Sequence, residues 1–443
     1  MQKSIEKNNI VYVPAHKTLN KNNPKYKTSV LDSIAKFIFS LLIFFMLSFP
    51  RHFQMSKMIM MGVLVVYVMF SGVVYKKTKI FYAVLLNLAF VALGTLVAFV
   101  NRNEDIFGFA SVNFLSFIIV VAIFFSFKKD AIPWVMRAII VSSIYIVLYN
   151  IVLVVHMYGI INIPIISMLD PTANVGFHEG FVHITSTNIS MLMFSMPLIF
   201  SLLIYAPKKF LSEVGYKRAT IFMVLMLNIL IMFLSGRRVM WLNIVIVAIM
   251  LGMFNFSSDI HSKKRRKILR LLCLVGLIFV IAILAFNASI RNRMFEIFQL
   301  DDNIRVIQMI YLWNGFLQRP FFGTGFGSAI YGVPGYEGST ILEVTYNLML
   351  YNTGIFGVAL YLGYVMLVIY FLLKEIRANN IFKPLLISSF MLFALILVNN
   401  ASNPYLMSSF DFHIFQVFPL WMIYLSQNCK TAKIKISHLY NCN

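Results

Sequence analysis

Charged residues and cysteines are scarce in this sequence, and each shortage excludes a class of protein. Asp, Glu, Lys and Arg make up 12% of the 443 residues, whereas a soluble domain carries about 25%. So few charges cannot cover the surface of a water-soluble chain, which excludes a cytosolic enzyme and a disordered protein. The three cysteines lie in an apolar run and in the C-terminal tail, so no disulfide framework is implied.

Long apolar runs fill most of the sequence instead. Hydrophobic residues make up 60% of the chain and the mean hydropathy is +0.81. Runs of about 17–25 apolar residues cross a bilayer as helices, because only a helix satisfies its own backbone there. The sequence therefore predicts an all-α, polytopic transmembrane bundle with about twelve spans. The predicted spans are residues 34–50, 58–75, 80–100, 106–127, 132–155, 188–206, 219–235, 239–256, 268–286, 345–373, 384–399 and 412–427.

The distribution of lysine orients these spans. Lysines concentrate in the N-terminal segment 1–33, in alternate loops and in the tail 428–443, so the positive-inside rule places both chain ends in the cytoplasm. The transmembrane domain is then 34–427, and the outer loops carry arginines but only one lysine, Lys57. The net charge of +22 is explained by the lysines and arginines of the cytoplasmic segments, which are attracted to anionic membrane lipid. A nucleic-acid partner is therefore not expected.

Two outer loops are long, at about residues 156–187 and 287–342, and loops of this length usually have a function. In the second loop, apolar residues recur at helical spacing over 303–318 and Pro320 follows. This pattern predicts an amphipathic helix at the membrane–water boundary. The following glycines, at 323, 325 and 327, indicate a tight turn and not a dinucleotide-binding fingerprint, because neither the spacing nor a preceding strand fits.

Arginines gather on the predicted outer surface. Arg237 and Arg238 share a very short turn between two apolar runs, at the edge of the hydrocarbon, where ionised groups are costly and often functional. Arg291, Arg293 and Arg305 add cations to the same side. A guanidinium group binds phosphate in a bidentate way, so these residues are candidates to neutralise a pyrophosphate. The alternative is that each arginine anchors a helix end or pairs with an outer acid.

Several other polar residues on the outer side are candidates for a site. Glu343 stands at the entrance of a membrane helix, where it is either a partner of the helix dipole or a catalytic base. Asp411 and His413, with His178 and Glu179, offer groups typical of sugar binding, against the alternative of ordinary solvated loops. His178 and His183 are five residues apart, one more than the zinc motif requires, so no metal site is expected.

The order of these elements resembles the O-antigen polymerase (Wzy-type) and O-antigen ligase superfamily of bacterial membrane glycosyltransferases. The resemblance covers about residues 219–373. The ligases of this family carry a histidine where alignment on Gly354 and Gly357 places Glu343 here, which favours the polymerase. The elements that carry the resemblance are Ser235-Gly-Arg-Arg238, the outer loop with Arg305, Trp313 and Pro320-Phe-Phe-Gly-Thr-Gly-Phe-Gly327, and the segment from Tyr346 to Gly357.

The resemblance implies an enzyme of the bacterial plasma (inner) membrane that polymerises undecaprenyl-pyrophosphate-linked oligosaccharide repeat units into O-antigen or capsular polysaccharide. The sugar–pyrophosphate bond supplies the energy, so no cofactor and no metal are needed, and a chain-length regulator is a further partner to consider. Arg305 and Glu343 are then the expected catalytic residues, with Glu343 as the base. Arg237, Arg238, Arg291 and Arg293 are the expected pyrophosphate-binding residues.

Two alternatives stay open. An O-antigen ligase performs the same chemistry with lipid A-core as the acceptor. A flippase or other transporter of lipid-linked oligosaccharides also fits about twelve spans, but transporters place ionisable groups or broken helices at mid-membrane depth. The predicted spans here are nearly free of ionisable residues, Arg137 excepted.

Overall fold

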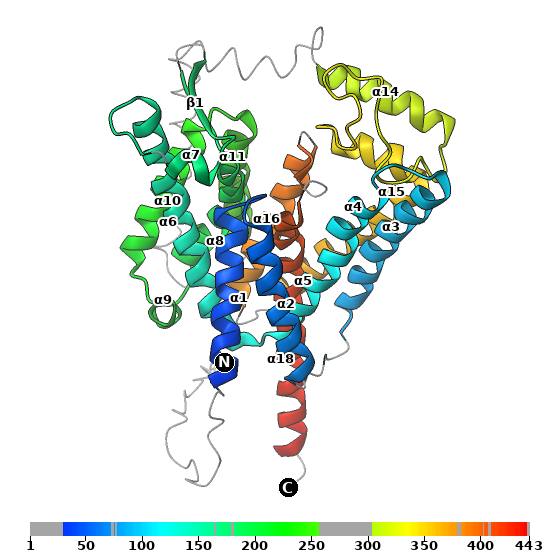
Figure 1. Cartoon of the computed structure of the whole chain (residues 1–443). Helices are drawn as coiled ribbons and strands as arrows, with labels where there is room; N and C mark the ends of the chain where they lie inside the picture. The colour runs from blue at the N-terminus through cyan, green and yellow to red at the C-terminus, as the bar shows by residue number, and fades with distance from the viewer. Residues whose placement is uncertain are drawn as a thin grey trace, which may run out of the picture.

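The computed structural model describes residues 30–71, 75, 78–163, 165–178, 181–256, 304–378, 382–401, 403–405 and 409–440. These residues are mostly helical, with one two-stranded antiparallel sheet (Figure 1). The prediction of a helical bundle is therefore confirmed. The small sheet, which lies in the predicted outer loop 156–187, was not expected.

The described elements divide into two halves of the chain. The first half contains α1 (Val30–Ser48), α2 (Gln54–Phe70), α3 (Ile80–Asn101), α4 (Ile106–Ala110), the π-helix η1 (Ser111–Leu115), α5 (Ser116–Ser126), the 3-10 helix η2 (Lys129–Ala131), α6 (Ile132–Met157) and α7 (Ile165–Leu169). The second half contains β1 (Asn174–His178), β2 (Phe181–Thr185), η3 (Asn188–Met191), α8 (Leu192–Tyr205), α9 (Lys208–Val214), α10 (Arg218–Leu234), α11 (Arg238–Phe256), α14 (Ile304–Gln318), α15 (Thr345–Arg377), α16 (Lys383–Asn400), η5 (Phe410–His413) and α18 (Ile414–Tyr440).

Seven helices in the described part of the chain are long and apolar enough to cross a membrane. Three shorter apolar helices accompany them, at Gln54–Phe70, Arg218–Leu234 and Val239–Phe254. The prediction of about twelve membrane spans is not confirmed by these helices. One of the predicted spans, 268–286, lies outside the described residues. The seven helical segments are Val30–Ser48, Ile80–Asn101, Ile106–Ser126, Lys129–Met157, Asn188–Tyr205, Thr345–Arg377 and Lys383–Asn400.

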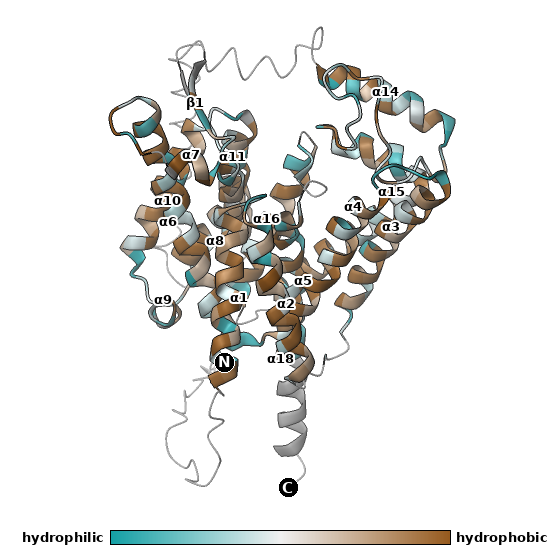
Figure 2. Cartoon of the chain, in the orientation of Figure 1, coloured by the Kyte–Doolittle hydropathy of each residue, from teal (hydrophilic) through white to brown (hydrophobic). Residues whose placement is uncertain are grey.

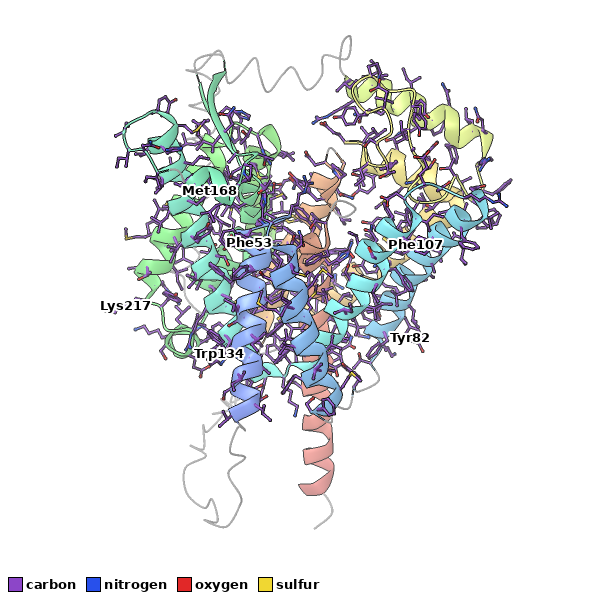
Figure 3. All side chains as sticks on the ribbon, viewed as in Figure 1. Phe53, Tyr82, Phe107, Trp134, Met168 and Lys217 are labelled. Atoms are coloured by element: carbon purple, nitrogen blue, oxygen red, sulfur yellow. The ribbon has the colours of Figure 1, made fainter. Side chains whose placement is uncertain are left out.

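The helices are mostly apolar, as their brown colour in Figure 2 shows, and many large apolar side chains are exposed on them. Phe107 on α4 is 85% exposed and Phe70 at the end of α2 is 84% exposed. Figure 3 marks Phe107 and another exposed aromatic residue, Tyr82, on the α3–α4 side of the molecule. A water-soluble protein rarely leaves such large apolar side chains exposed over a whole surface, so this surface is compatible with a lipid environment.

The helices form two groups around a centre. One group contains α1, α6, α8, α10 and α11, the other contains α3, α4, α14 and α15, and α16 and α18 lie between them (Figure 1). The described chain begins and ends at the same end of the bundle, whereas β1 and α14 lie at the opposite end (Figure 1). We call this opposite end the distal end. The helix predicted at 303–318 is present as α14, whose exposed side chains include Ile310, Trp313 and Leu317.

The glycine-rich turn after α14 supplies hydrogen-bond partners for the backbone at a break in α15. Gly354 has φ 60° and ψ −165°, so the helical hydrogen-bond ladder is interrupted there. The N–H of Gly325 donates to the carbonyl of Asn352 at 2.8 Å, and the N–H of Ile355 donates to the carbonyl of Pro320 at 2.9 Å. Backbone groups freed by the break thus find partners in the turn, as buried backbone groups must in an apolar setting.

The same turn also fastens α15 to α3, and only glycine fits its closest approach. Gly325 has φ +84°, and a Cβ atom there would lie 2.2 Å from the backbone nitrogen of Ala98 on α3. The side-chain amide of Asn101, at the end of α3, donates to the carbonyl of Thr324 at 2.8 Å. The interpretation of 323–327 as a tight turn is therefore confirmed.

Gly325→Ala is expected to destabilise the protein by roughly 2–4 kcal/mol, because the new methyl group collides with the α3 backbone and alanine disfavours the positive φ. Gly338→Ala is the matched control. Gly338 has φ +75°, and a Cβ atom there would meet nothing within 4 Å, so it should lose only about 1–2 kcal/mol. Thermal unfolding of the two purified variants in detergent measures the difference; equal losses would contradict the proposed close contact.

Candidate functional site

Asp411, for which the sequence predicts sugar binding, forms a buried ion pair. Its Oδ1 atom lies 2.7 Å from the Nζ atom of Lys57, and neither side chain has any exposed surface. Lys57 also donates to the carbonyl of Phe49 at 2.7 Å. The sequence placed Lys57 in an outer loop, but the residue lies on α2 and points into the bundle.

The second carboxylate oxygen of Asp411 holds the connection between α1 and α2. It accepts hydrogen bonds from the backbone N–H of Arg51 at 2.9 Å, from the Gln54 amide at 3.2 Å and from the Ser409 hydroxyl at 2.8 Å. Arg51 has φ 66°, a left-handed conformation that non-glycine residues rarely adopt. With both carboxylate oxygens engaged and no surface exposed, Asp411 has a structural role in this state.

Arg305 and Glu343 were predicted separately, and the structure brings them together. Arg305 Nε donates to Glu343 Oε2 at 2.7 Å, and the Tyr336 hydroxyl donates to Oε1 at 3.1 Å. Burial, followed by the neighbouring Glu343 carboxylate, raises the pKa of Tyr336, so the phenol remains a donor at neutral pH. The Arg305 and Glu343 side chains are 43% and 34% exposed, and a pair this open contributes about 0.2–1 kcal/mol. The pair joins α14 to the segment that precedes α15.

Arg237, in the turn between α10 and α11, is held by neutral groups. One guanidinium nitrogen donates to the Ser190 hydroxyl at 3.0 Å and another to the Ser186 carbonyl at 3.4 Å. The residue is half-buried. Among the described residues, no carboxylate lies within 4 Å of this guanidinium group, although other cations do form such pairs. Within the described part of the chain, its charge is therefore oriented by neutral acceptors and has no counter-charge.

The serines that contact Arg237 belong to a buried network of hydroxyl and amide groups. The Ser186 hydroxyl lies 2.8 Å from the side-chain oxygens of both Asn150 and Asn188, and the Asn150 amide donates to Asn188 at 3.0 Å. The Ser190 hydroxyl lies 3.4 Å from that of Tyr405. These residues are at most 6% exposed. We call Ser186, Asn188, Ser190, Asn150 and Tyr405 the Arg237 platform.

Asp170 fixes the segment that carries the platform. Its Oδ2 atom accepts from the backbone N–H and the hydroxyl of Thr187, at 3.0 and 2.9 Å, and its Oδ1 atom accepts from Thr172. Burial alone would raise the pKa of Asp170, but the hydrogen bonds from Thr172 and Thr187 outweigh it and hold the pKa below its usual value. The carboxylate is therefore ionised at neutral pH and keeps all four bonds.

The turn itself needs glycine beside Arg237. Gly236 has φ +63°, and a Cβ atom there would lie 2.4 Å from a ring carbon of His183 on β2. The β hairpin thus packs directly on the α10–α11 turn. This contact places the hairpin, the arginine and the platform at the distal end of one helical group.

The remaining predicted residues are only partly described. Arg238 begins α11 and His178 ends β1, but their side chains lie outside the described part, as do Glu179, Arg291 and Arg293 entirely. Arg237 precedes α11 and Arg305 lies on α14, and these helices belong to different groups at the distal end (Figure 1). The two predicted arginines whose side chains are described, Arg237 and Arg305, therefore lie in different places with different neighbours. Within the described residues, no three His, Cys, Asp or Glu side chains gather as a metal site.

Sequence reasoning missed the platform. Asn150 lies in an apolar run of α6, and an amide at such a position was a usable signal, because polar groups in membrane helices are costly and tend to have a role. The two serines gave no signal of their own. No family model matches the sequence, and no curated protein matches it either, so a functional assignment depends on the chemistry of these residues.

Asp411→Ala is expected to destabilise the fold by about 3–5 kcal/mol, because it leaves the Lys57 ammonium buried and unpaired. The double variant Lys57→Met with Asp411→Leu should recover much of this loss. Glu343→Ala, which breaks the exposed pair, should cost no more than about 1 kcal/mol. Thermal unfolding in detergent compares the three variants. A loss for Asp411→Ala no larger than that for Glu343→Ala would contradict the structural role of the buried pair.

Proposed function

We propose that the chain is a membrane glycosyltransferase of the O-antigen polymerase type, acting on undecaprenyl-pyrophosphate-linked oligosaccharide repeat units. In this proposal the chain crosses the bacterial inner membrane about twelve times, both ends are cytoplasmic, and the distal end faces outward. The observation that supports it is Arg237: a half-buried guanidinium group, oriented by Ser190 and Ser186, with no described carboxylate beside it.

Such a group is suited to a pyrophosphate. When a guanidinium group pairs with a carboxylate, the carboxylate compensates its positive charge and weakens its attraction for an anionic ligand. A guanidinium group held by neutral acceptors has a fixed orientation and an uncompensated positive charge. Its place, at the junction of the apolar helices α10 and α11, would let the polyprenyl tail stay in lipid while the diphosphate meets the arginine. Fixed positive charge there stabilises the negative charge that develops on the leaving pyrophosphate.

The proposed reaction is a substitution at the anomeric carbon of the growing chain. A hydroxyl oxygen of the incoming repeat unit forms the new C–O bond. The bond from the anomeric carbon to the pyrophosphate oxygen breaks, and its electron pair stays with the lipid pyrophosphate. The hydroxyl proton passes to a base. Glu343, the base expected from the sequence, lies beside Arg305 in the other helical group, so it would act in this step only if the segment before α15 and the α10–α11 turn meet on the substrate. Neither metal nor cofactor enters these steps.

Arg237→Ala is expected to abolish long-chain polysaccharide and leave material with a single repeat unit, because losing one such electrostatic contact slows transfer by roughly 10²–10³. The test complements a deletion strain with each variant and compares lipopolysaccharide banding on a gel. Arg319→Ala is the matched control: Arg319 follows α14 and is exposed, so normal banding is expected. Equal amounts of each protein in the membrane, measured by immunoblot, are required for the comparison.

The deletion strain also separates the polymerase from its alternatives. Loss of polymer with retention of one capped unit supports the polymerase. Loss of all attached glycan would instead indicate the ligase, and repeat units trapped on the inner leaflet would indicate a transporter. Normal chain length in Arg237→Ala would overturn the assignment of Arg237 to the pyrophosphate.

A further inference from the structure

His52, in the turn between α1 and α2, faces the buried carboxylate of Asp170. Its Nε2 atom lies 3.4 Å from Asp170 Oδ1. This nitrogen is buried although the side chain is 25% exposed, and it forms no hydrogen bond with the described residues. A neutral imidazole gains little from such a contact, whereas an imidazolium forms a charge-assisted bond with a carboxylate. The strength of the contact therefore depends on the charge of His52.

The backbone on both sides of His52 has an unfavourable conformation. Arg51 and Phe53 have φ 66° and 52°, values that non-glycine residues rarely adopt. The Arg51 N–H donates to the Asp411 carboxylate at 2.9 Å, which fixes the turn from the side of the bundle. Such conformations persist only where the surrounding contacts impose them, and they often occur at functional sites. The turn is therefore held in a strained form that keeps the ring of His52 beside Asp170.

One peptide group connects Asp170 with Arg237. The N–H of Thr187 donates to Asp170 Oδ2 at 3.0 Å. The carbonyl of the same peptide group, which belongs to Ser186, accepts from the Arg237 guanidinium group at 3.4 Å. The carboxylate and the guanidinium group thus orient one peptide dipole from its two ends. A contact that stabilises the position of Asp170 therefore also stabilises the contact of Arg237 with its platform.

Histidine is the side chain that ordinarily changes its charge between about pH 5 and 8. Burial opposes the ionisation of Asp170, but its hydrogen bonds outweigh burial and hold its pKa below the usual value, so the carboxylate stays charged over this range. The other ionisable groups around the contact are of types that do not ordinarily titrate there. They are Tyr145 and Tyr149, which interact with the Asp170 charge, the exposed Arg51, and the Lys57–Asp411 pair.

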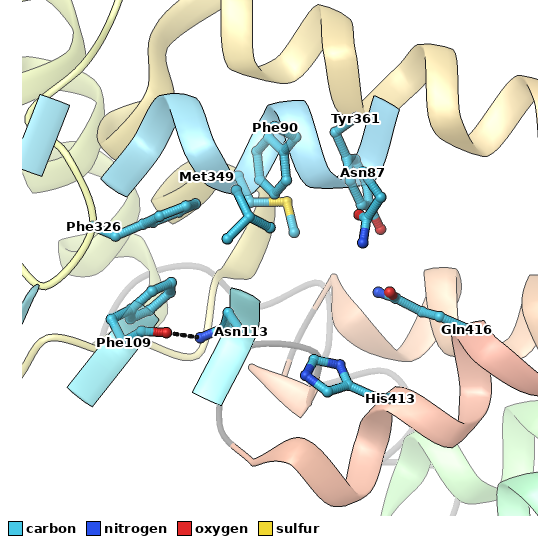
Figure 4. Close-up of a pocket in the computed structure, with 10 residues that line it drawn as sticks. Asn87, Phe90, Phe109, Asn113, Phe326, Met349, Tyr361, His413 and Gln416 are labelled. Atoms are coloured by element: carbon cyan, nitrogen blue, oxygen red, sulfur yellow. Dashed lines mark hydrogen bonds between the residues drawn. The ribbon is translucent and has the colours of Figure 1, made fainter. Parts of the chain in front are cut away.

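His413 is a buried histidine with different neighbours. Its Nε2 atom lies 2.8 Å from the Val112 carbonyl and 3.0 Å from the Ser116 hydroxyl, and its ring borders a small cavity beside Gln416 (Figure 4). None of the described residues that line this cavity is Asp, Glu, Lys or Arg. Protonation of this ring would therefore gain no carboxylate within the lining, in contrast to protonation of His52.

We propose that His52 and Asp170 form a latch that acid strengthens, between the α1–α2 turn and the Arg237 platform. Protonation of His52 completes the ion pair, which holds the Ser186–Thr187 peptide group and with it the Arg237 guanidinium group. The contribution of the pair is complete at acid pH, where the imidazole is charged, and is lost as the pH rises above about 7. The latch requires no transfer reaction, so this inference goes beyond the proposed function and stands or falls separately from it.

The test is hydrogen–deuterium exchange with mass spectrometry on the full chain in lipid nanodiscs, measured over peptides that cover residues 181–190. Wild type and His52→Gln are compared at about pH 5.5 and at about pH 8, on either side of the histidine titration. Comparison at the same pH cancels the intrinsic pH dependence of exchange. Glutamine keeps a hydrogen-bond donor but carries no charge. The variant should therefore exchange about fivefold faster than wild type at the acid pH and equally fast at the alkaline pH.

His156→Gln is the matched control. His156 Nδ1, at the end of α6, accepts from the Ile163 N–H at 3.0 Å, and no described carboxylate pairs with this ring as Asp170 does with His52. Its difference from wild type should therefore not grow toward acid pH. In Asp170→Asn, which lacks the carboxylate, His52→Gln should have no further effect at acid pH. A His52→Gln effect that is equal at both pH values, that also grows in His156→Gln, or that persists in Asp170→Asn would overturn the proposal.

Discussion

Polar groups in an apolar bundle have to find partners within the chain, because neither lipid nor packed side chains offer any. The Lys57–Asp411 pair shows how this constraint shapes the fold. The carboxylate accepts bonds from α2, from the α1–α2 turn and from Ser409, so three parts of the sequence are fixed at one point. The break in α15 obeys the same constraint, since the glycine-rich turn supplies partners for the interrupted ladder. Places where the constraint is not met are therefore informative.

Arg237 and Arg305 differ in whether the positive charge of the guanidinium group has a partner of opposite charge among the described residues. Arg305 has a carboxylate partner, and its exposed pair connects two segments at the surface. Arg237 has oriented neutral acceptors and, in the described part of the chain, no counter-charge. An ionised group that is half-buried without a counter-ion is favourable only if a ligand or water compensates it. This contrast makes Arg237 the better candidate for an anionic substrate, although both residues are arginines at the distal end.

Local pattern predicted much of the fold but little of the site. The predicted span 80–100 became α3 and the predicted span 384–399 became α16, because a long apolar run in such a chain can only be a helix. The hairpin β1–β2 was missed, although alternating apolar residues on both sides of Glu179-Gly180 were a usable signal. The pairing of Lys57 with Asp411 could not be predicted, since 354 positions separate them. The platform under Arg237 likewise combines α6, the η3 region and Tyr405, and no spacing rule connects these parts.

One segment near the end of the chain touches each of these polar features of the distal half. Tyr405 meets the Arg237 platform through Ser190 and packs on Phe412 with ring centroids 5.0 Å apart. Asp411 holds the α1–α2 turn, and His413 lies 2.8 Å from the Val112 carbonyl through Nε2. Tyr405 and Asp411 therefore connect the Arg237 platform with the α1–α2 turn, and a displacement of one of these residues would disturb the polar contacts of both regions.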